Sequence, residues 1–87
     1  MANPWYHLDP RSPEVLKLLR GLDPAQELVA RMALNGLCPR CRGDRTWRQR
    51  VQELQETTCR NDDDLARIMT RSREFERELR GALTEGA

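Results

Sequence analysis

The chain has little of what most enzymes and membrane proteins require. Its 87 residues include one histidine, one tyrosine, one phenylalanine and two tryptophans. No apolar run approaches the ~20 residues needed to span a bilayer, and the N-terminal segment lacks the basic and apolar regions of a secretory signal. The sequence also shows no glycine-rich phosphate loop and no Ser-His-Asp or Cys-His arrangement. We therefore expect a cytoplasmic protein that is not an enzyme and has no membrane partner.

Large hydrophobic side chains are also scarce. Only 38% of the residues are hydrophobic, whereas 33% are charged. A chain this short buries a small fraction of its surface, and proteins of this size usually rely on a metal, a disulfide or a partner chain. The composition predicts one small helical domain over residues 1–87 with a thin core. Because the net charge is only +1, any preference for nucleic acid must come from a local patch.

Proline and glycine divide the first half of the chain. Residues 1–11 are predicted to form an extended arm, because each of its two prolines disfavours helix in the residue before it. Residues 12–35 are predicted to form two short helices, since each segment begins with a capping residue followed by proline and ends near a glycine. The starts are Ser12-Pro13 and Asp23-Pro24, and the stops are Gly21 and Gly36.

The second half contains neither glycine nor proline between Arg45 and Gly81. This predicts a long helix over residues 45–83, about 57 Å in length. Its inward positions repeat at heptad spacing: Trp47, Val51, Leu54, Thr58, Asn61, Leu65, Ile68, Ser72, Phe75, Leu79 and Ala82. The unbroken register favours one helix. The alternative is a break near 59–62, because Asn61 and three aspartates form a good helix start.

The predicted fold is therefore all-α: a helical hairpin or small bundle of two short helices and one long C-terminal helix. Two short helices cover only part of a rod this long, so the exposed part of its apolar stripe is predicted to bind another protein chain. Either a hetero-complex or a homodimer satisfies this prediction. The alternative is a stripe that packs only on the protein's own helices. The predicted partner-binding residues are Leu65, Ile68, Phe75 and Leu79, with Trp5 of the arm as a second anchor.

The turn over residues 36–44 contains Cys38-Pro39-Arg40-Cys41-Arg42-Gly43. Two thiolates two residues apart can chelate one tetrahedral zinc ion, and these six residues resemble half of a zinc-ribbon or treble-clef site. Zinc is thus a candidate cofactor with Cys38 and Cys41 as ligands, joined by Cys59 or His7. A continuous helix from Arg45 places Cys59 about 21 Å away along the axis, so it excludes a zinc site built from all three cysteines of one chain. Without metal, the cysteines are two exposed thiols in a turn and one beside the helical seam.

Arginines gather around the same turn. Such a cluster can neutralise phosphates, with a neighbouring indole stacked on a base. This gives an alternative function, a small zinc-dependent nucleic-acid-binding regulator. Its predicted contact residues are Arg40, Arg42, Arg45, Trp47 and Arg48. The low net charge and the nearby acidic residues favour a solvated basic turn, so an accessory or regulatory protein that acts through helix-mediated contacts is the first hypothesis.

Overall fold

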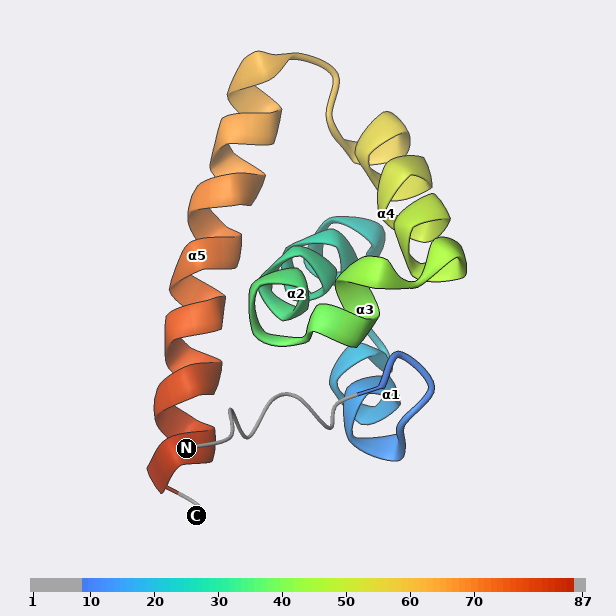
Figure 1. Cartoon of the computed structure of the whole chain (residues 1–87). Helices are drawn as coiled ribbons and strands as arrows, with labels where there is room; N and C mark the ends of the chain where they lie inside the picture. Colours follow the sequence, from blue (N-terminus) through green and yellow to red (C-terminus); the bar gives the residue numbers. More distant parts are fainter. Residues whose placement is uncertain (1–8, 86–87) are drawn as a thin grey trace.

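The computed structural model describes residues 9–85, and side chains as far as Ala82. Within these residues the protein is built from helices alone, which confirms the all-α prediction (Figure 1). The five helices are α1 (Pro13–Leu19), α2 (Pro24–Leu37), α3 (Pro39–Gly43), α4 (Arg45–Thr58) and α5 (Asp62–Glu85). No helix in this part of the chain is both long and apolar enough to cross a membrane.

Side-chain caps fix where the helices begin. In each case a side-chain oxygen accepts a hydrogen bond from a backbone N–H three residues later, which satisfies a donor that the helix leaves unpaired. The pairs are Ser12 with Val15 (3.4 Å), Asp23 with Gln26 (2.8 Å), Asp44 with Trp47 (2.8 Å) and Asn61 with Asp64 (2.9 Å). The predicted starts of the first two helices are confirmed, but α2 continues through Gly36 to Leu37.

The prediction of one helix over 45–83 is wrong, because the chain bends between Thr58 and Asp62. Asp64 accepts a hydrogen bond from the backbone N–H of Arg60 at 3.0 Å, while its own N–H donates to Asn61. These two hydrogen bonds resemble a capping box, and they satisfy backbone N–H groups that would otherwise bond within a continuous helix. The longest dimension of the molecule is 40 Å, shorter than the predicted rod. The alternative of two helices capped by Asn61 is the observed arrangement.

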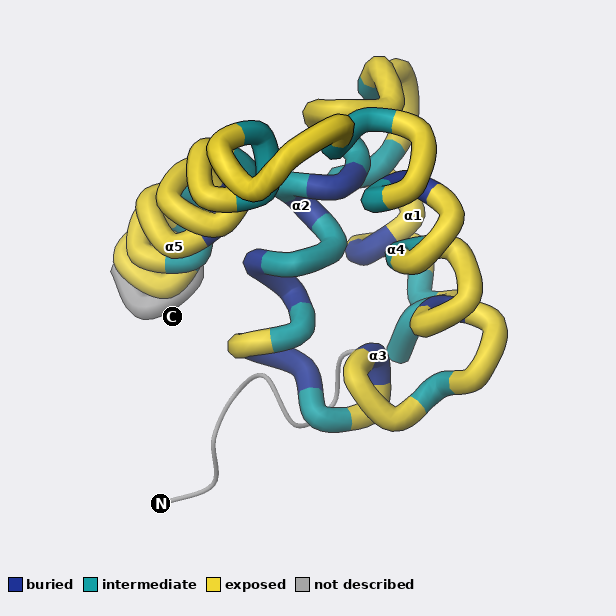
Figure 2. The backbone as a smooth tube through the Cα atoms, turned by 90° about the horizontal axis from the view of Figure 1, so that it is seen from above, coloured by how far each residue is buried: buried dark blue, intermediate teal, exposed yellow. Residues whose placement is uncertain are grey.

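Helix α2 lies at the centre, with α4 and α5 packed on different sides of it (Figures 1 and 2). Leu28, Leu34 and Leu37 of α2 are almost completely buried, whereas the outer face of α5 is exposed along its length. The carboxylate of Glu76 on α5 lies against Gly36 of α2. A Cβ atom at Gly36 would overlap this carboxylate, so a larger residue there would displace the flexible end of the Glu76 side chain.

The core joins four helices around the cysteine pair. Its buried members are Val15, Leu34, Cys38, Cys41 and Trp47, against which Leu18, Leu19, Val51 and Leu79 pack. The segment predicted as a turn over 36–44 instead contains one short helix, α3. Helix α3 thereby places both cysteines inside the molecule, which corrects the expectation that their thiols are exposed.

Candidate functional site

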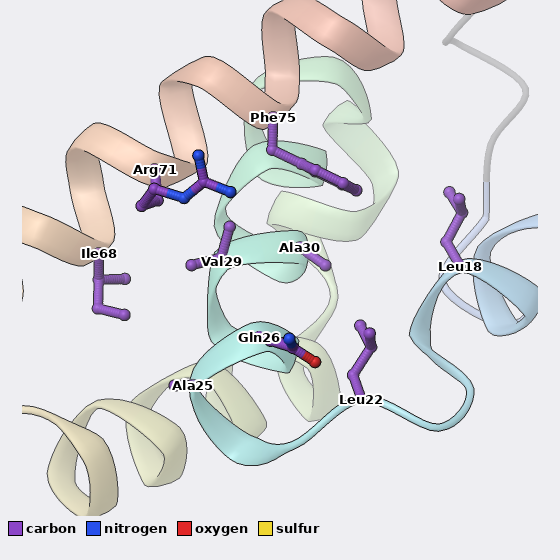
Figure 3. Close-up of a pocket in the computed structure, with 9 residues that line it drawn as sticks. All are labelled: Leu18, Leu22, Ala25, Gln26, Val29, Ala30, Ile68, Arg71 and Phe75. Carbon is purple, nitrogen blue, oxygen red and sulfur yellow. The ribbon is translucent and has the colours of Figure 1, made fainter.

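An open apolar groove lies between α5 and the first two helices (Figure 3). It has a volume of about 500 Å³. Val29 and Ala30 of α2 form its floor, and Figure 3 shows Ile68 and Phe75 projecting from α5 above them. The remaining lining residues are Leu18, Leu22, Ala25, Gln26 and Arg71. Grooves with mostly apolar walls and few polar groups are typical of binding sites.

The structure divides the predicted partner-binding residues among different surroundings. Ile68 and Phe75 line the groove. Leu79 packs against the core, and Leu65 lies beside the α4–α5 bend in a separate shallow depression. Trp5 lies outside the described residues. The heptad pattern therefore identified the inward face of α5, but not which of its residues α2 leaves partly uncovered.

Sequence reasoning missed the half of the groove that α1 and α2 provide. Leu18, Leu22 and Val29 had no predicted binding role, because apolar residues in or beside short helices usually face the core. They line an open groove because α5 leaves the bend at an angle that carries it across α2 (Figure 1). That angle depends on the α4–α5 bend, which helical periodicity does not specify.

The predicted metal ligands Cys38 and Cys41 lie together at the start of α3. Both residues are 0% exposed, and the Cys41 backbone N–H donates to the Cys38 Sγ at 3.1 Å. Burial, followed by the contact with Cys38, raises the pKa of the Cys41 thiol. The Cys41 thiol is therefore protonated at neutral pH.

Among the described residues, no further ligand named from the sequence joins the cysteine pair. Cys59 lies at the α4–α5 bend, where it lines a depression with Arg60 and Asn61, and His7 lies outside the described residues. Within residues 9–85, no three His, Cys, Asp or Glu side chains are grouped to hold a metal ion. All three cysteines are described, and none forms a disulfide.

The predicted arginine cluster covers the exposed corner formed by α3 and α4. Arg40, Arg42, Arg45 and Arg48 are exposed, and none of the four forms an ion pair with another described residue. Trp47 does not share this surface. Its side chain is 2% exposed, so in this conformation the indole is not available to stack on a base.

Trp47 instead takes part in a polar connection between α2 and α4. Its Nε1 donates to Asn35 Oδ1 at 2.7 Å, and the Arg31 guanidinium lies 4.5 Å from the ring centroid. Arg31 donates to Glu27 at 2.7 Å, and Arg50 donates to both Glu27 oxygens at 3.0 Å. The hydrogen bond from Arg50 is the largest influence lowering the pKa of Glu27, and Arg31 adds to it. We call this connection, formed by Glu27, Arg31, Arg50, Trp47 and Asn35, the Glu27 clamp. It gives Trp47 and Arg50 a structural role that needs no bound ligand.

Comparison with known proteins identifies no relative. No family model, no curated protein and no solved structure matches the chain. The groove, the cysteine pair and the arginine corner are therefore the features of the molecule that bear on its function.

Proposed function

We propose that the protein is a non-catalytic accessory or regulatory factor that binds an amphipathic helix of a partner protein in the groove between α5 and α1–α2. The observation that carries this proposal is an apolar groove of about 500 Å³ with walls from three helices. A helix presenting side chains at i, i+3, i+4 and i+7 would fill such a groove, as in other helix-in-groove complexes. The buried apolar area would provide the main driving force.

Charge at the rim indicates which helix the groove prefers. Among the described lining residues, Arg71 carries the only charge. Its guanidinium pairs with Glu74 at 2.7 Å, but the two side chains are 64% and 48% exposed. Because an exposed pair of this kind contributes little, a carboxylate on the partner can replace Glu74 at small cost. The preferred partner helix therefore carries an acidic residue beside its apolar face.

A substitution at the rim tests the groove without removing core contacts. Ala25 is exposed at the second position of α2, where glutamate suits the helix dipole. In Ala25→Glu a negative charge would be added to the lining of the groove, which also includes Arg71, and it would disfavour an acidic partner helix. The matched control is Ala66→Glu, because Ala66 is an exposed alanine near the start of α5 that does not line the groove.

The assay is selection from a displayed library of helical peptides, followed by fluorescence anisotropy with the selected sequences. We expect peptides with apolar residues at helical spacing and an acidic neighbour, and at least a tenfold weaker affinity for Ala25→Glu than for Ala66→Glu. Equal binding by the two variants would reject the groove. Self-association in sedimentation experiments that Ala25→Glu abolishes would instead assign the groove to a second copy of this chain.

A second candidate function rests on the four unpaired arginines of the α3–α4 corner. Arg40, Arg42, Arg45 and Arg48 form an exposed basic surface that could bind the phosphates of a nucleic acid. Binding to a single-stranded oligonucleotide would then weaken with salt at a slope of about −0.7 per phosphate contact. Replacing these four residues by glutamine should flatten the slope, while Arg73→Gln and Arg77→Gln on α5 should not. An affinity that is independent of salt would exclude this function.

A further inference from the structure

We propose that two copies of this chain exchange α5, so that the α5 of each copy packs on the α2 of the other. In the resulting dimer, α4 and α5 of one chain would join into a single continuous helix. The exchange is independent of what the groove binds, because it rebuilds the same groove with Val29 from one copy and Phe75 from the other. Exchange of an identical element is a low-cost route to a dimer, since it replaces contacts within a chain by the same contacts between chains.

The junction between α4 and α5 differs from the other junctions between the described helices, because it contains neither proline nor glycine. Pro24 and Pro39 occupy the first positions of α2 and α3, and Gly43 precedes α4. Proline and glycine both oppose the continuation of a helix. Only residues 59–61 separate α4 from α5, and each of them can enter a helix at modest cost. This junction is therefore the one that can straighten.

Helix α5 can move as a unit, because it packs mainly on α2 and contacts α4 little beyond the bend (Figure 1). Its ion pairs Arg71–Glu74 and Arg80–Glu76 both lie within the helix, so they would survive the exchange. The apolar packing on α2 is non-directional and would form again on the second copy. What the exchange gives up is the pair of capping hydrogen bonds around Asn61.

The hydrophobic register also permits the joined helix. Leu54, Thr58, Asn61 and Leu65 follow one another at intervals of four, three and four residues, so on a continuous helix they share one face. The inward faces of α4 and α5 would then point to the same side. There α4 would meet the α2 of its own chain, and α5 would meet the α2 of the second copy. A change of register at the bend would instead have left one of these faces in solvent.

Sedimentation equilibrium of the full chain, refolded from urea at several concentrations, tests the exchange. The wild type should form a reversible dimer. Its longest dimension by X-ray scattering should exceed the 40 Å of the monomer, because a continuous helix from Arg45 to Glu85 is about 60 Å long. Ala25→Glu should leave this dimer intact, which distinguishes it from a dimer that fills the groove, and failure of the groove to bind helical peptides would not affect the result. Monomers at millimolar concentration in both the wild type and Asn61→Ala would overturn the proposal.

Substitutions at the bend should shift this equilibrium in opposite directions. Asp62 is the first residue of α5, where proline is tolerated in the monomer but prevents α4 from continuing. Asp62→Pro should therefore weaken the dimer at least tenfold relative to the matched control Asp62→Ala, with the monomer still helical by circular dichroism. Equal dimerisation by these two variants would show association without exchange and would refute the proposal.

Asn61→Ala provides the complementary test. It removes a cap that the monomer has and the joined helix lacks, and each dimer contains two such bends. The dimer should therefore become at least tenfold tighter. The matched control is Asp44→Ala, which removes the equivalent cap of α4 and should leave the dimer affinity unchanged. Tightening of the same size in both variants would assign the effect to a general loss of stability and count against the exchange.

Discussion

The Glu27 clamp provides a quantitative test of how α4 is held to α2. We consider Glu27→Gln, which keeps the shape of the side chain but removes its charge. The Glu27 side chain is 14% exposed, and it accepts hydrogen bonds from Arg31 and Arg50. Arg50 lowers the Glu27 pKa most, yet its side chain is 44% exposed, so water screens part of this contact. Arg31, at 16% exposure, would be left without its carboxylate near the Trp47 ring.

The expected cost follows from these exposures. Hydrogen bonds to charged groups contribute about 1.5–3 kcal/mol when well buried, and screening at Arg50 reduces this to about 1–2 kcal/mol for Glu27→Gln at pH 7. For a protein of this size, each kcal/mol lowers Tm by about 4–8 °C. The matched control is Glu53→Gln, because Glu53 pairs with the same arginine at 3.5 Å but is 66% exposed. That change should cost less than about 0.5 kcal/mol.

The pH dependence distinguishes a charge effect from a packing effect. The pKa of Glu27 is lowered from its ordinary value of 4.5, so the unfolded chain takes up this proton first as pH falls. The stabilisation is therefore fully present above about pH 4.5 and is lost as the pH falls through the lower pKa of the folded state. Urea unfolding of the wild type and Glu27→Gln should converge at low pH. A cost equal to that of Glu53→Gln, or a difference that persists below the folded pKa, would refute the reasoning.

Three further substitutions test the fold. Asp44→Ala removes the α4 cap at the Trp47 N–H and should cost about 1 kcal/mol in urea unfolding; no change would show that water replaces the cap. Leu28→Ala empties a fully buried position of α2 and should cost about 2–5 kcal/mol, which calorimetry can measure; a cost below 1 kcal/mol would mean that α4 and α5 collapse onto the gap. Asn61→Ala removes the cap of α5 and should lower stability by about 1 kcal/mol. If helix content by circular dichroism rises instead, the cap is what prevents one continuous helix.

The sequence predicted the inward face of the second half better than it predicted its path. Trp47, Leu54 and Ser72, all at heptad positions, are buried residues of α4 and α5. The same spacing is compatible with a straight helix and with two helices that share a register, so periodicity could not decide between them. The chain forms two helices because of local hydrogen bonds around Asn61 and Asp64. These bonds involve the backbone, so the hydrophobic pattern of the sequence does not reveal them.

The candidate sites were foreseen to different degrees for similar reasons. Cys38 and Cys41 were singled out from their spacing alone, but their complete burial depends on α3, the short helix that begins at Pro39 in a segment predicted as a turn. Trp47 was predicted both as an inward heptad residue and, in the alternative function, as a base-stacking residue. The sequence could not decide between these roles, because it does not show that Asn35 and Arg31 lie against the indole. The sequence predicted only the α5 side of the groove. The other side comes from α1 and α2, which are about forty residues away from α5 in the chain.

The bend between α4 and α5 has a consequence for how the molecule comes apart. It presents an exposed arginine, Arg60, followed by the exposed Asn61, outside any helix and therefore accessible to trypsin under native conditions. A cut at this bond alone, in a variant that lacks the other arginines exposed outside helices, Arg11 and Arg20, would yield residues 1–60 and 61–87. The two fragments would be held together mainly by the packing of α5 on α2. The association constant of the separated fragments, measured without denaturant, would then give the free energy with which α5 packs on α2.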